Sequence, residues 1–138
     1  MAINIKQNAD MSGGLQGTDG DDGAFITVSY VLTTTAPTAG VALVTPNRRM
    51  IVKAATLRTD AAVTGGNITL FKASSGTAIG SGTALCSATS ANTTLNTNSS
   101  ISLTSGTTDV AAGQSIGFTM SAAITAGTTT LTLMLAPA

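Results

Sequence analysis

Short stretches in which apolar and polar residues alternate dominate this chain. In the first of them Ile26, Val28, Tyr30 and Leu32 occupy every second position, which places their side chains on one face of a β-strand. In the last, Leu131, Leu133 and Leu135 follow the same spacing. The same pattern predicts further strands within residues 41–45, 49–58, 68–72, 101–103 and 116–120.

The predicted strand over residues 49–58 has Ile51 and Leu57 on one face and Val52 on the other. Residues 64–67, Thr-Gly-Gly-Asn, are a turn signal between this strand and the one that begins at Ile68. We therefore expect these two strands to form a hairpin.

Turn-forming residues divide the chain from residue 24 onward into about seven to nine short strands. Thr and Gly are poor helix formers and recur throughout these residues, so helices are not expected. We predict an all-β, jelly-roll-like β-sandwich of antiparallel strands spanning residues 24–138. Its core is expected to be aliphatic, with Phe25, Phe71 and Phe118 as larger fillers.

Residues 1–23 are rich in Gly and Asp and have no periodicity, which predicts an extended arm. The arm is acidic, because it contains one positive residue, Lys6, and four aspartates, which gives a net charge of −3. The remaining residues hold five positive and two negative groups, a net charge of +3. The aspartates of the arm are Asp10, Asp19, Asp21 and Asp22.

The composition argues against catalysis and against a cofactor. The 138 residues include no His and one Cys, so a nucleophile would lack its usual base, and we expect no enzyme activity. Cys86 has no disulfide partner in the chain and is expected to be a small buried hydrophobe. Asp19, Asp21 and Asp22 are a weak candidate for calcium, since their spacing does not match an EF-hand loop. The alternative is a solvated, turn-forming tail.

Charge and hydropathy also bear on partners. The net charge is zero, which provides no basic field for nucleic acid or for a membrane surface. The mean hydropathy is +0.36, yet no run of about 18 apolar residues is present to form a membrane helix. The first residues lack the apolar core of a secretory signal, so synthesis in the cytoplasm is expected.

Arg48 and Arg49, with Lys53 and Arg58 further along, form the most basic region of the sequence. They could receive an acidic surface or the acidic arm of a neighbouring subunit. The alternative is solvated strand ends whose charge protects a sheet edge. A sugar-binding site would need an aromatic platform, and Tyr30 is expected to lie in the core instead.

Several segments resemble small virion proteins of tailed bacteriophages, namely the jelly-roll decoration (cement) and head-fibre proteins. The likeness rests on residues 49–60, 67–83, 109–118 and 131–137. It implies a homotrimer seated on the outer surface of a capsid, bound to the major capsid protein and stabilising the shell. The protein would then be located at the virion surface after synthesis in the host cytoplasm.

The residues expected to contact the capsid lie in the arm and in the basic region. They are Asp10, Asp19, Asp21, Asp22, Arg48, Arg49 and Arg58. The alternative function is a host-recognition module, such as a fibre tip or adhesin, that binds a cell-surface glycan.

Overall fold

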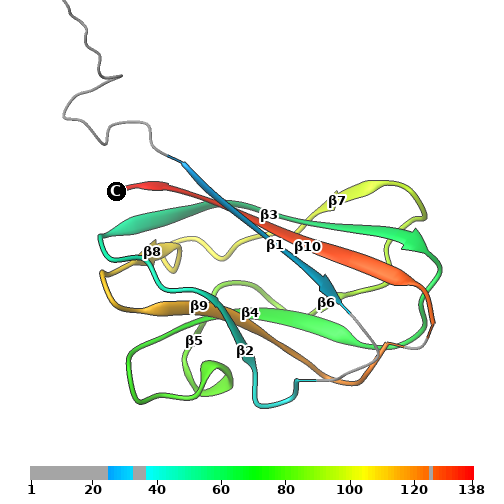
Figure 1. Ribbon diagram of the computed structural model, residues 1–138, viewed down its shortest axis with the longest axis horizontal. Coiled ribbons are helices and arrows are strands. Elements are labelled where there is room, and N and C mark those ends of the chain that lie inside the picture. Colours follow the sequence, from blue (N-terminus) through cyan, green and yellow to red (C-terminus); the bar gives the residue numbers. More distant parts are fainter. Residues whose placement is uncertain (1–24, 33–36, 125) are drawn as a thin grey trace, which may run out of the picture.

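The computed structural model describes residues 25–32, 37–124 and 126–138. They form two antiparallel five-stranded sheets that pack face to face as a sandwich (Figure 1). The first sheet has the order β1-β10-β3-β7, with β8 also paired to β3, and the second has the order β2-β9-β4-β5, with β6 also paired to β4. This arrangement confirms the predicted all-β sandwich.

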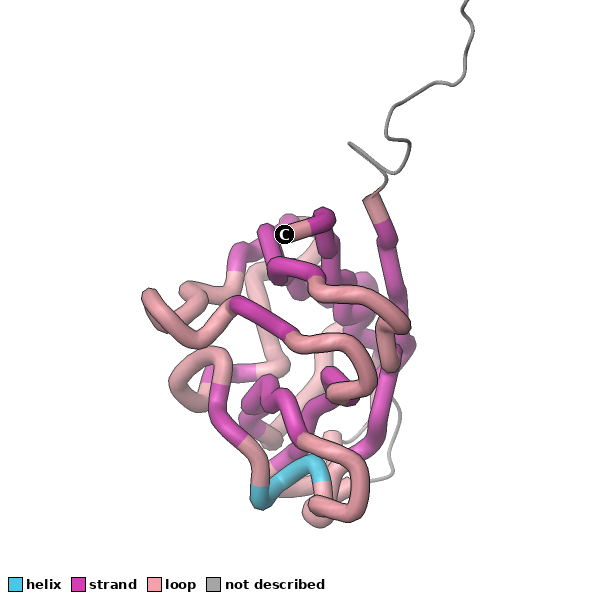
Figure 2. The backbone as a smooth tube through the Cα atoms, turned by 90° about the vertical axis from the view of Figure 1, so that its left-hand side faces the viewer, coloured by secondary structure: helices cyan, strands magenta, loops and turns pink. Residues whose placement is uncertain are grey.

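The first sheet contains β1 (Ile26–Leu32), β3 (Met50–Ala61), β7 (Asn98–Ser100), β8 (Asp109–Val110) and β10 (Thr128–Pro137). The second contains β2 (Val41–Val44), β4 (Asn67–Ala73), β5 (Thr83–Ala84), β6 (Thr89–Ser90) and β9 (Ser115–Met120). Within the described residues the helical structure is limited to one short 3-10 turn, Ile79–Ser81 (Figure 2). The strand predicted at residues 101–103 is displaced, because β7 ends at Ser100 and Leu103 makes only an isolated bridge to Cys86.

β10 occupies the centre of the first sheet, between β1 and β3. Its register with β1 runs from the pair Ile26 and Leu135 to the pair Leu32 and Thr129. Leu131, Leu133 and Leu135 are fully buried, as their alternation predicted. The apolar face of β1 points to the same side, since directly opposite residues share a face.

The predicted hairpin between β3 and β4 is wrong, because the two strands belong to different sheets. The connection crosses the sandwich instead and buries Val63 between the sheets. Gly65 and Gly66 both adopt positive φ there, which glycine does without a steric penalty. A Gly-Gly turn suits a hairpin and a crossover equally, so the local pattern could not separate them.

The predicted faces of β3 are also wrong. Val52 and Leu57 are both buried, and the register with β10 shifts between Met134 and Leu135. Ala54 lies opposite Met134 and Val52 opposite Leu135, which leaves Lys53 as the extra residue of a β-bulge. The extra residue reverses the alternation, so strict counting from one end of the strand fails beyond it.

The core follows the expected aliphatic composition, with Phe118 as its largest buried side chain. Tyr30 packs partly against the core and meets the Phe118 ring edge-on, with ring centroids 5.2 Å apart. Cys86 is buried, as predicted. Phe25 is not a core residue: 60% of its surface is exposed, because it precedes β1 at the margin of the sheet.

Candidate functional site

A row of hydroxyl groups crosses the outer face of the first sheet. Ser29 of β1 lies opposite Thr132 of β10, which lies opposite Thr56 of β3, which in turn lies opposite Ser100 of β7. The Ser29 and Thr132 hydroxyl oxygens are 3.2 Å apart and share a hydrogen bond. We call these four residues the hydroxyl row. It gives the sheet a polar, uncharged strip that runs across four strands.

A shallow cavity of about 350 Å³ lies beside the hydroxyl row. Its lining combines hydroxyl, amide and guanidinium groups, from Thr56, Arg58, Asn98, Thr130 and Thr132. The volume is at the lower end of the range for small-molecule sites. The cavity can therefore offer hydrogen-bond donors to a polar ligand.

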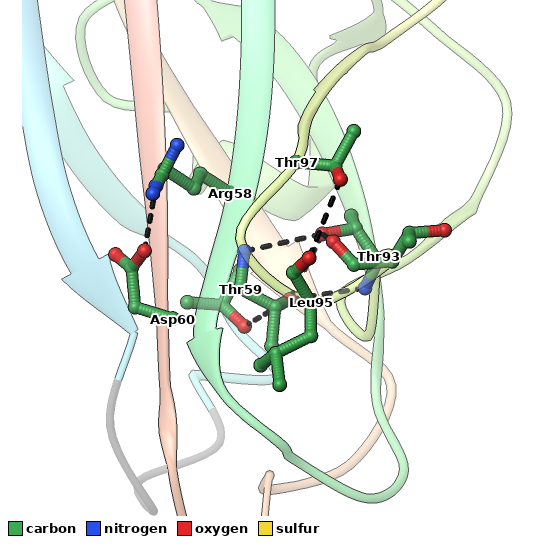
Figure 3. A network of polar contacts seen from close by, with 8 residues as sticks. Arg58, Thr59, Asp60, Thr93, Leu95 and Thr97 are labelled. Carbon is green, nitrogen blue, oxygen red and sulfur yellow. Dashed lines mark hydrogen bonds and ion pairs between the residues drawn. The ribbon is translucent and has the colours of Figure 1, made fainter.

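Arg58 is held in place at this cavity by its neighbour on the same face of β3. Its Nε donates a hydrogen bond to Asp60 Oδ1 at 2.6 Å (Figure 3). Both side chains are a little under half exposed, so solvent screens the ion pair. The bond orients the guanidinium while the two terminal nitrogens are not engaged by Asp60, and a guanidinium fork suits a carboxylate or phosphate.

Arg49 makes a second ion pair at the opposite end of β3. Its Nε and Nη2 donate to the two oxygens of Asp109 at 2.8 and 3.2 Å. The hydrogen bond and the charge of Asp109 raise the pKa of Arg49. The Lys72 ammonium also donates to the Asp109 carbonyl oxygen. Asp109 therefore binds two cationic side chains, Arg49 through its carboxylate and Lys72 through its backbone carbonyl.

The structure does not unite the basic residues that the sequence placed together. Arg49 lies directly before β3 and Arg58 lies nine positions further along, within the strand, which corresponds to a separation of roughly 30 Å. Arg48 and Arg49 both precede β3. The four predicted acidic partners, Asp10, Asp19, Asp21 and Asp22, lie outside the described residues.

Within the described residues, no group of three or more His, Cys, Asp or Glu side chains lies close enough together to hold a metal ion. The calcium candidate, Asp19, Asp21 and Asp22, lies outside that part of the chain. No helix among the same residues is long and apolar enough to cross a membrane.

A polar network joins three threonines of the sandwich, and Figure 3 shows the part of it around Thr59 and Thr93. Thr59 and Thr129 have no exposed surface, and their hydroxyl oxygens are 3.0 Å apart. The Thr59 backbone N–H donates to Thr93 Oγ1 at 3.1 Å, and the Thr93 N–H donates to Thr59 Oγ1 at 3.0 Å. The Thr129 hydroxyl donates to the Ala91 carbonyl at 2.9 Å. The network attaches the loop before β7 to β3 and β10.

This network was not predicted from the sequence, although a signal for it was present. Thr59 lies two positions after Leu57, and Thr129 lies two positions before Leu131. Each threonine therefore points to the same inward face as its leucine, and all four are buried. A polar side chain at an inward position must find a hydrogen-bond partner. The partners come from a loop more than 30 positions away from Thr59, which the local pattern does not reveal.

Cys86 is placed as a structural residue. Its sulfur accepts a hydrogen bond from the Leu70 N–H at 3.3 Å. Burial raises the pKa of the Cys86 thiol, which disfavours the reactive thiolate.

Comparison with known proteins identifies no family for this chain. No family model matches the chain, and no curated protein matches it. One similar solved structure is the "Cyanophage Pam1 capsid asymmetric unit", with 13% sequence identity, full coverage of both chains and a TM-score of 0.48. That similarity is too low to identify a family or a function.

Proposed function

We propose that this protein is a non-catalytic structural component of a bacteriophage virion that decorates the outer surface of the capsid and stabilises it. The proposal starts from the resemblance of residues 49–60, 67–83, 109–118 and 131–137 to decoration and head-fibre proteins. It includes the major capsid protein as partner and the capsid surface as location. The homotrimer that the resemblance implies stays a prediction.

The hydroxyl row is the observation that carries the proposal. Ser29, Thr132, Thr56 and Ser100 offer short, uncharged hydrogen-bonding groups with little side-chain freedom to lose on contact. A broad face of this kind can lie against a protein shell without the cost of burying unpaired charges. Arg49 and Asp109, and Arg58 and Asp60, already neutralise one another within the chain.

The rigidity of the sandwich supports the same role. The Thr59, Thr93 and Thr129 network fixes a loop to the two central strands of the first sheet. A preorganised surface loses less entropy when it binds. A protein that binds only the assembled shell stabilises it by a free energy that grows with the ratio of its concentration to its dissociation constant.

The test is co-sedimentation of the purified protein with capsids of the cognate phage that lack it. We expect saturable binding and a capsid melting temperature that rises with the concentration of added protein. Replacing Thr56 by Lys places a charge in the hydroxyl row and should weaken binding. Unchanged capsid melting at saturating protein, with no co-sedimentation, would refute decoration.

Deleting residues 2–22 tests the acidic arm separately. If the arm contacts the capsid through Asp10, Asp19, Asp21 and Asp22, the deletion abolishes co-sedimentation while the melting temperature of the sandwich is kept. Substituting Arg48, Arg49 and Arg58 by Gln tests the basic candidates in the same assay. Full binding by the deletion variant would remove the arm from the mechanism.

A second candidate function is recognition of a host glycan, and the cavity beside the hydroxyl row favours it. Asn98, Arg58 and three threonines provide the donors and acceptors that a sugar requires. An acidic sugar could also pair with the Arg58 guanidinium. Binding on a glycan array that is lost in Arg58→Gln would favour this function, whereas decoration predicts no glycan binding.

A further inference from the structure

β1 forms one margin of the first sheet. Among the described residues its only strand partner is β10. Its seven residues extend over about 23 Å. Proteins usually protect such an edge with charge, proline or a very short strand, yet Ile26–Leu32 contains no charged residue and no proline.

Exposed apolar side chains gather at this same margin. Of the five large apolar side chains that are exposed in the described residues, four lie on β1 or next to it. Phe25 is 60% exposed, Val31 52% and Met134 38%, and Ile26 is the fourth. The opposite margin of the sheet, β7, consists of Asn98, Ser99 and Ser100. The two edges of one sheet therefore differ sharply in polarity.

The apolar side chains of the β1 margin are separated from one another in a single copy. Met134 lies opposite Thr27, near the start of β1, while Val31 lies near its end. Thr27 and Ser29 share the outer face with Val31, because they alternate with the inward residues. Phe25 precedes Thr27 by two positions and is about 20 Å from Val31 along the strand. One copy alone cannot bring these groups together.

We propose that a second copy of this chain docks on the β1 margin by antiparallel pairing of the two β1 strands, centred on Ser29. Ser29 then lies opposite the partner's Ser29, and Val31 lies opposite the partner's Thr27. The diagonal neighbour of Val31 is the partner's Phe25, which is within reach of an aromatic side chain. Two-fold symmetry forms this contact twice, so the separated apolar groups join into two clusters.

The inward face fits the same register. Val28 lies opposite the partner's Tyr30, and Ile26 lies opposite the partner's Leu32. Each pair is apolar, and Val28 and Tyr30 are only half-buried in one copy. No like charges meet, because neither β1 nor β10 carries a charged residue. A different protein would find no charge on this edge to recognise, whereas an identical strand completes both faces.

The proposed contact is independent of the decoration proposal. It is a two-fold contact in which the same surface is used on both copies, so by itself it produces pairs. The trimer implied by the resemblance would need a different surface. If the protein fails to bind capsids, the pairing still stands, and if the pairing fails, decoration can still be observed by co-sedimentation.

Cysteine cross-linking tests the register directly. Directly opposite residues of an antiparallel pair have Cβ atoms about 4.5–5.5 Å apart, close to the separation that a disulfide requires. Ser29→Cys places two thiols at the two-fold axis. Val31→Cys is the matched control. In the proposed register Val31 lies opposite the partner's Thr27, so the two Val31 residues are offset by four positions and lie about 13 Å apart. Cys86 is buried in both variants.

Under mild oxidation we expect Ser29→Cys to run as a disulfide-linked pair on a non-reducing gel, and Val31→Cys to run as a single chain. Equal cross-linking of the two variants, or none for Ser29→Cys, would overturn the proposal.

Light scattering provides a second, independent readout. The wild-type protein should have the mass of an even number of protomers, and Ser29→Lys should halve that mass by placing a charge at the centre of the edge. Ser100→Lys, the same change at the opposite margin, should keep the wild-type mass. A wild-type mass of one or three protomers, or a Ser29→Lys mass equal to wild type, would overturn the two-fold contact.

Discussion

The substitution Thr59→Val removes one buried hydroxyl while keeping the shape of the side chain. Thr59 Oγ1 is the acceptor for the Thr93 N–H and lies 3.0 Å from the Thr129 hydroxyl. The Ala91 carbonyl keeps its bond from Thr129, but the Thr93 N–H loses its acceptor. The Thr93 N–H is only partly buried, so its lost acceptor costs about 1–2 kcal/mol, in the lower part of the range for an unsatisfied group, and the lost hydroxyl pair costs about 1 kcal/mol more.

We therefore expect Thr59→Val to lower the free energy of unfolding by about 2–3 kcal/mol. For a domain of this size that corresponds to a decrease of roughly 8–12 °C in the melting temperature. The assay is urea denaturation followed by circular dichroism, together with a thermal scan. Amide exchange should also accelerate in the loop around Thr93, because that loop loses its attachment to β3.

Thr56→Val is the matched control. Thr56 lies on the same strand, three positions earlier, on the outer face of the sheet and only half-buried. The same chemical change there should alter the unfolding free energy by no more than about 0.5 kcal/mol. If Thr59→Val is no more destabilising than Thr56→Val, the buried network does not stabilise the sandwich and the reasoning is refuted.

Three further predictions concern single sites. Gly117→Ala should destabilise the protein by about 1–3 kcal/mol in urea denaturation, because an added Cβ meets the Val41 carbonyl across the β2–β9 pair; wild-type stability would contradict that close approach. Cys86 should react with a thiol reagent only after denaturation, and since burial raises its pKa in the folded state, its contribution to stability should decline as pH rises above about 8.5. Cys86→Ala should not show this decline. An equal dependence of the unfolding free energy on pH in the two proteins would contradict a raised pKa of Cys86. Arg49→Gln should leave the melting temperature unchanged at high salt, since its ion pair is exposed; a large decrease there would show that Arg49 has a structural role.

The sequence predicted the elements of this fold better than their arrangement. The alternation in β1 and β10 identified both strands and their inward faces, because a period of two follows from backbone geometry alone. The same period cannot tell which strand lies beside which. β3 and β4 were therefore wrongly paired, although each was recognised as a strand. The bulge at Lys53 changed the faces of β3, since one extra residue reverses every later position.

The candidate site was less predictable for a related reason. Arg58 and Asp60 are two positions apart on one strand, so their contact follows from the sequence. The pairing of Arg49 with Asp109 joins residues 60 positions apart, and the hydroxyl row draws one residue from each of four strands. Both depend on the order of strands in the sheet. The buried threonines show the limit most clearly, because their inward positions were visible while their loop partners were not.

The central place of β10 has a consequence for how the protein folds as it is synthesised. β1 pairs with β10 through contacts such as Ile26 with Leu135, so its strand partner is made more than 100 residues later. At a synthesis rate of about 5–20 residues per second, the uncharged β1 segment waits for at least several seconds without that partner. During this interval neighbouring nascent chains on one polysome could pair through it prematurely. The first sheet is therefore completed only after β10 has been synthesised, and slower synthesis should increase aggregation of this chain.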